Sequence, residues 1–97
     1  MRLRPHEVTA IKAAAVEAFG PTATVRLFGS RLRDDLRGGD VDLHLEVDEA
    51  PDLPTRSRLA LALEKAVDGR KVDMVFSIRG GVLRGFERIA YRDGVVL

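Results

Sequence analysis

The stretch LFGSRLRDDLRGGDVDLHLEV, residues 27–47, joins a short apolar segment to a strand pattern that contains two aspartates. Apolar and polar side chains alternate strictly over residues 40–47, which predicts a strand with one face in the core and one face in water. Aspartate is depleted in strands because its short polar side chain favours bonds to the local backbone. Two aspartates on one strand face, Asp40 and Asp42, therefore require an explanation.

A shared metal ion explains the two aspartates. Their side chains point the same way, with Cα atoms about 6.5 Å apart. Magnesium prefers carboxylate oxygens together with the phosphates of a nucleotide, so the pair forms half of such a site. Asp73, in the later strand pattern 71–76, is the expected third member if its strand lies beside the first. Three carboxylates gathered in this way repel one another, and a cation relieves that repulsion.

The start of the same stretch has features of a phosphate-binding turn. Gly29 and Ser30 follow a predicted strand, so the turn offers backbone N–H groups, a close approach at the glycine and a hydroxyl donor. Arg31 is a candidate for a further phosphate contact, although an arginine after a turn is equally common on any surface. Taken alone, each motif also fits an ordinary turn, a helix N-cap or a solvated strand face. Their combination favours a nucleotide site.

In this order the motifs resemble a known family. Gly29-Ser30, nine intervening residues, the segment DVDL at 40–43 and the later strand VDMVF at 72–76 are similar to the minimal nucleotidyltransferases of the DNA polymerase beta superfamily. The similarity is greatest to a small bacterial branch whose members often act as antitoxins beside a HEPN-domain partner. It extends over nearly the whole chain, from the first predicted helix to RIAYRDGVVL at 88–97.

The resemblance implies roles for the site residues. Gly29 and Ser30 would hold the triphosphate, and Asp40 and Asp42 would carry two magnesium ions. Asp73 would help to bind one metal and accept the proton of the attacking hydroxyl. The implied reaction is in-line attack on the α-phosphorus of a nucleoside triphosphate, with ATP as the expected donor. The expected acceptor is a hydroxyl of a HEPN-type protein partner, which would be AMPylated.

The rest of the pattern predicts one domain, residues 1–97, of the α/β (α+β) class. Helical spacing covers 6–19, the segment from Pro54 to a cap at Gly69, and 82–90, with a short helical turn at 30–36; strands are expected over 23–28, 40–47 and 71–76. A short connection predicts that the first two strands are antiparallel, and a helical crossover allows the second and third to be parallel. We expect a small mixed sheet of polymerase beta-like fold, covered by helices mainly on one side.

Composition limits the classes of function. The net charge of +1 and the single tyrosine argue against direct binding to nucleic acid, which makes a stand-alone nucleic-acid module the weakest alternative. Cysteine is absent, and no apolar stretch reaches membrane-spanning length, so we expect a cytoplasmic protein without membrane association. The main alternative to an enzyme is a non-catalytic antitoxin that neutralises its partner by binding alone.

Overall fold

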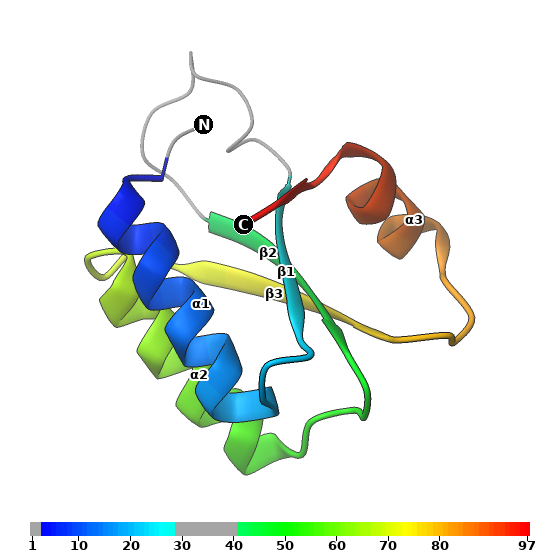
Figure 1. Cartoon of the computed structure of the whole chain (residues 1–97), viewed down its shortest axis with the longest axis horizontal. Coiled ribbons are helices and arrows are strands. Elements are labelled where there is room, and N and C mark those ends of the chain that lie inside the picture. The colour runs from blue at the N-terminus through cyan, green and yellow to red at the C-terminus, as the bar shows by residue number, and fades with distance from the viewer. Residues whose placement is uncertain (1–2, 29–40) are drawn as a thin grey trace.

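The computed structural model describes residues 3–28 and 41–97 (Figure 1). The chain alternates helices and strands in the order α1 (Pro5–Phe19), β1 (Thr24–Phe28), β2 (Val41–Val47), α2 (Leu53–Ala66), β3 (Val72–Ile78), α3 (Gly85–Asp93) and β4 (Val95–Val96). This mixture confirms the α/β class. The predicted helices and strands are present, with ends that differ by a few residues. The helical turn expected at 30–36 lies outside the described residues.

The four strands form one mixed sheet in the order β3-β2-β1-β4. β1 pairs antiparallel with β2, and β2 pairs parallel with β3, so both predicted relations between neighbouring strands are confirmed. β4 was not expected from the sequence, which indicated only a short apolar tail after Gly94. Its two residues pair with β1, with Val95 opposite Leu27 and Val96 opposite Arg26. A strand of this length has no periodicity to detect, and only its pairing partner defines it.

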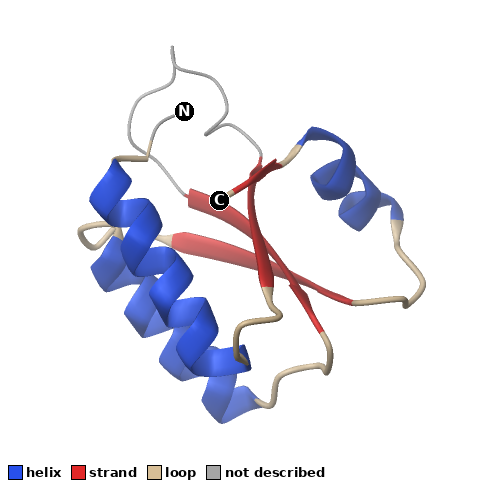
Figure 2. Cartoon of the chain, viewed as in Figure 1, coloured by secondary structure: helices blue, strands red, loops and turns tan. Residues whose placement is uncertain are grey.

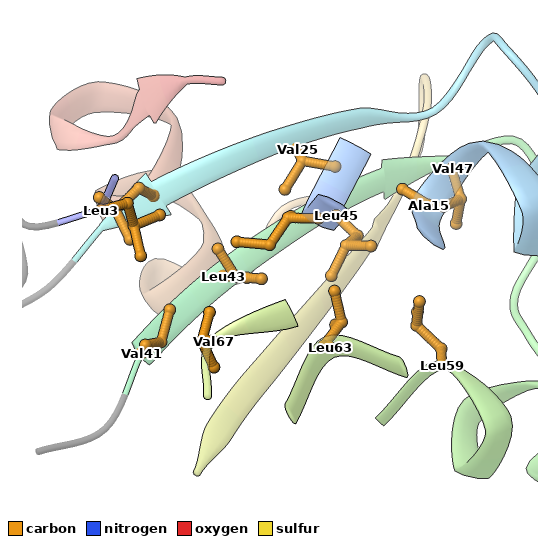
Figure 3. Packing of buried hydrophobic residues seen from close by; sticks show 12 residues of the cluster. Leu3, Ala15, Val25, Val41, Leu43, Leu45, Val47, Leu59, Leu63 and Val67 are labelled. Atoms are coloured by element: carbon orange, nitrogen blue, oxygen red, sulfur yellow. The ribbon is translucent and has the colours of Figure 1, made fainter. Parts of the chain in front are cut away.

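The two faces of the sheet are covered differently. Helices α1 and α2 lie together on one face, and α3 lies on the other side (Figure 2). The main core fills the space between α1, α2 and the sheet, and its members on β2 are the alternating apolar residues of the predicted core face (Figure 3). The fully buried residues on this face of β2 are Val41, Leu43, Leu45 and Val47.

α2 is the crossover helix between β2 and β3, and residues at its two ends explain where it begins and ends. Asp52 caps the helix, because its carboxylate accepts a hydrogen bond of 2.8 Å from the backbone N–H of Thr55. Gly69, the cap expected from the sequence, follows the helix in the left-handed conformation, with φ at 82°. The crossover returns the chain to the sheet at Val72, so β3 can run parallel to β2.

The expectation that the polar face of β2 is exposed to water is wrong at His44. Its side chain is fully buried, and its ring meets the ring of Tyr91 on α3 edge to face, with centroids 4.7 Å apart. The prediction placed helices mainly on the opposite face. Because α3 crosses this face as well, it removes the middle of β2 from solvent.

Replacement of Leu43 by alanine tests the position of the core. Leu43 is fully buried on the central strand β2, so Leu43→Ala should lower the free energy of unfolding by about 2–5 kcal/mol through lost burial and a residual cavity. Leu61→Ala is the control, because Leu61 is 62% exposed on α2 and its loss should change stability by less than about 0.5 kcal/mol. Urea unfolding followed by circular dichroism measures both. Equal effects of the two substitutions would contradict this packing.

Candidate functional site

Two of the three predicted acidic residues are neighbours in the sheet. Asp42 on β2 and Asp73 on β3 are register partners in the parallel pairing. Adjacent strands lie about 4.8 Å apart, and register partners point to the same face of a sheet. The prediction that the strand of Asp73 lies beside the strand of Asp42 is therefore confirmed, and their carboxylates share the face that carries α3.

The acidic pair lies where three strand ends meet. Asp42 is the second residue of β2 and Asp73 the second residue of β3, while Phe28, the last residue of β1, is the antiparallel register partner of Asp42. β1 therefore ends beside the two carboxylates. In the sequence the next residues after Phe28 are those of the predicted phosphate-binding turn. The predicted site residues Gly29, Ser30, Arg31 and Asp40 lie outside the described residues.

Asp73 remains accessible to solvent. Its side chain is 46% exposed, and the amine of Lys71 lies 3.7 Å from one of its carboxylate oxygens. Lys71 is itself largely exposed, so this ion pair is screened by water and contributes little to stability. A ligand can displace the flexible amine at small cost.

The electrostatics of the pair favour a cation. Two unit charges 4 Å apart repel by about 1 kcal/mol in water and about 4 kcal/mol at an effective dielectric of 20. Asp42 and Asp73 would offer hard oxygen ligands from two adjacent strands, and magnesium selects such ligands when phosphate oxygens or water complete its coordination. The donor set therefore fits the metal that the family resemblance implies.

A buried polar network begins two residues along β2 from Asp42. The hydroxyl of Ser77 on β3 donates a hydrogen bond of 2.6 Å to the carboxylate of Glu87 on α3, and its oxygen lies 2.8 Å from Nε2 of His44. Because the single hydroxyl proton goes to Glu87, Nε2 of His44 must carry a proton and donate to Ser77. Nδ1 of His44 is then an acceptor, and it has no hydrogen-bond partner among the described residues.

The network attaches α3 to the sheet by hydrogen bonds. Its geometry does not fit nucleophilic catalysis. Ser77 is 1% exposed, and its proton is directed to Glu87 instead of to a histidine base. Burial lowers the pKa of His44, which keeps the ring neutral. The hydrogen bond from Ser77 lowers the pKa of Glu87 and keeps the carboxylate ionised. Sequence reasoning missed this cluster; the available signal was the polar face of β2 combined with the amphipathic segment 82–90.

Further ion pairs hold the same face of the sheet. The carboxylate of Glu46 on β2 forms ion pairs with Arg26 of β1 at 2.9 Å and with Arg79 at 3.3 Å. The guanidinium of Arg26 also lies over the ring of Tyr91, 4.4 Å from its centroid, so β1 and β2 are joined to α3 by charge as well as by packing. These groups are already paired with one another.

A second group of possible metal ligands is less suitable. Atoms of His6, Glu7 and Asp68 lie within 4.8 Å of one another. Both oxygens of Glu7 are already engaged, one by the backbone N–H of Arg4 at 2.8 Å and the other by the guanidinium of Arg70. A metal ion there would have to displace an arginine from a nearly buried carboxylate, so this group does not provide an open site.

Comparisons with known proteins add no family to this description. No family model matches the chain, and a search of curated proteins finds no significant match. Within residues 3–28 and 41–97, no helix has the length and apolar character needed to cross a membrane.

Removal of the Ser77 hydroxyl tests the buried network. Ser77→Ala leaves His44 and Glu87 without a shared partner, so the free energy of unfolding at pH 7 should fall by about 1–3 kcal/mol. The folded-state pKa of Glu87 is below its ordinary 4.5, so the stability that depends on ionised Glu87 is present above pH 4.5 and is lost as pH falls through the folded-state value. The difference between wild type and variant should therefore shrink in acid.

Urea unfolding at pH 7 and at a series of acidic pH values measures this difference. The control is Ser57→Ala, because Ser57 is exposed on α2 and its substitution should change stability by less than about 0.5 kcal/mol. A Ser77→Ala variant as stable as wild type at pH 7 would show that the network does not hold α3.

Proposed function

We propose that this protein is a magnesium-dependent nucleotidyltransferase that transfers a nucleoside monophosphate, AMP from ATP, to a hydroxyl of a partner protein. The observation that carries the proposal is the register pairing of Asp42 with Asp73 at the end of the sheet where β1 ends and where β2 and β3 begin. It supports a two-strand carboxylate site at the position that the sequence motifs require. The resemblance to minimal nucleotidyltransferases supplies the reaction and the polymerase beta-like fold as parts of the same proposal.

Each predicted residue has a task in this reaction. Asp42 and Asp73, together with Asp40, would bind two magnesium ions, and Asp73 would also accept the proton of the attacking hydroxyl. The turn after β1, with Gly29 and Ser30, would hold the triphosphate. When bound, the two ions supply charge stabilisation at the entering and leaving oxygens, and pyrophosphate leaves. Arg31 would add a charged contact to the phosphates.

The partner belongs to the proposal as well. The resemblance indicates the antitoxin of a HEPN/nucleotidyltransferase pair, whose acceptor would be a tyrosine hydroxyl on the HEPN-type toxin. The chemistry of the site requires only a hydroxyl acceptor placed in line with the α-phosphorus. The acceptor must therefore approach the end of the sheet where Asp42 and Asp73 lie, at the start of β2 and β3.

Label transfer tests the proposed reaction. Purified protein incubated with α-labelled ATP, magnesium and the protein encoded beside it in the genome should transfer label to that partner. Asp42→Asn and Asp73→Asn should each reduce transfer by about 100-fold or more, because each removes a metal ligand needed for charge stabilisation in the transition state.

Asp52→Asn is the matched control. It makes the same chemical change beyond the opposite end of β2, and asparagine caps a helix as well as aspartate does. Wild-type transfer in the Asp42→Asn variant would contradict the proposal. Neutralisation of the partner without any transfer, retained in Asp42→Asn, would instead support the non-catalytic antitoxin.

A further inference from the structure

β3 is an edge strand, and its outer side is unpaired in the described part of the chain. Hydrogen bonds at the two ends of the β2–β3 ladder show which residues face inward: the carbonyl of Lys71 accepts from Val41 at 2.9 Å, and the N–H of Arg79 donates to Val47 at 2.8 Å. In a parallel ladder every second residue bonds to the same neighbour. Met74 and Phe76 therefore direct their backbone N–H and C=O groups away from β2.

A groove of about 400 Å³ follows this edge. It is bounded by α2 on one face of the sheet and by α3 on the other, and its lining residues are Arg56, Met74, Val75, Phe76, Arg84 and Glu87. The strand itself, VDMVFSI, contains no proline or glycine. Natural edge strands are commonly protected by proline, bulges or a covering segment. β3 shows none of these within the described residues.

The charged residues of the groove lining are two arginines and one glutamate, a net charge of +1. Arg56 lies above the ring of Phe76, with its guanidinium carbon 5.3 Å from the centroid, and no described carboxylate forms an ion pair with it. Arg84 is 88% exposed on the other flank, where its Nε lies 3.1 Å from Oε2 of Glu87, so this flank is close to neutral. A segment that enters the groove thus meets a positive charge without a described carboxylate partner at Arg56, on the α2 side of the sheet.

We propose that the outer edge of β3 binds an extended, acidic segment of a partner protein, which adds to the sheet as a fifth strand. Strand addition would satisfy the backbone groups of Met74 and Phe76, while alternate acidic side chains would meet Arg56. A second copy of the chain is a poorer occupant, because antiparallel pairing of two β3 edges places the arginines of both copies close together. Asp73 lies on the same strand, one residue before Met74, but the proposed binding uses the outward backbone groups of β3 and not the carboxylate of Asp73.

Peptide binding tests this surface in the absence of metal and nucleotide, so that its result is independent of nucleotidyl transfer. The probe is a fluorescent peptide of about nine alternating valine and glutamate residues, long enough to span the seven residues of β3. Its glutamates all fall on one face of the strand, and we expect the register that places them on the α2 side, opposite Arg56, because Arg84 is already paired with Glu87. Wild-type protein should bind it, and amide hydrogen exchange at Met74 and Phe76 should slow in the complex.

Matched controls separate strand addition from simple attraction of charge. Arg56→Glu should weaken binding about tenfold or more, whereas Arg58→Glu, which makes the same change on the same helix outside the groove, should have little effect. A peptide N-methylated at alternate residues cannot form the ladder and should not bind. Binding that survives N-methylation, no binding at all, or a dimer formed through β3 would each overturn the proposal.

Discussion

The parallel pairing of β2 with β3 is the constraint on which the rest of this structure depends. It places Asp42 directly beside Asp73, and the crossover through α2 makes it possible. The register is fixed by the apolar pattern, since a slip of one residue would turn every side chain of β3 to the other face. Met74 and Phe76 would then leave the core side of the sheet, and Asp73 would enter it. The same burial that stabilises the fold therefore aligns the two carboxylates.

The face of the sheet that carries α3 has a buried hydrogen-bonded network in its middle and a solvent-accessible carboxylate, Asp73, at one end. α3 is held by Ser77, which joins His44 of β2 to Glu87 of the helix through a buried hydrogen-bonded network. The network lies along the middle of β2 and β3, and the acidic pair lies at their beginning, where Asp73 is still half exposed. The strands that carry Asp42 and Asp73 are thus packed on both faces, which would hold the two carboxylates in place for the metal site that we propose.

Much of this architecture could be predicted from local sequence. Alternation over residues 40–47 and helical spacing around Leu59 and Leu63 report burial directly, so the helices, the three longer strands and the proximity of Asp42 to Asp73 followed from pattern and topology. Three features could not be predicted in this way: the burial of His44, the strand β4 and the free edge of β3. Each depends on which distant segment of the chain covers it or pairs with it. The spacing of apolar residues within one segment does not indicate which distant segment lies against it.

Diffraction from crystals soaked with manganese and a non-hydrolysable ATP analogue tests the central claim most directly. Manganese occupies magnesium sites and has an anomalous signal that identifies the metal without ambiguity. We expect an anomalous peak beside the carboxylates of Asp42 and Asp73, with the triphosphate of the analogue at the end of β1. An empty Asp42–Asp73 pair at saturating manganese, or a peak at His6, Glu7 and Asp68 instead, would contradict it.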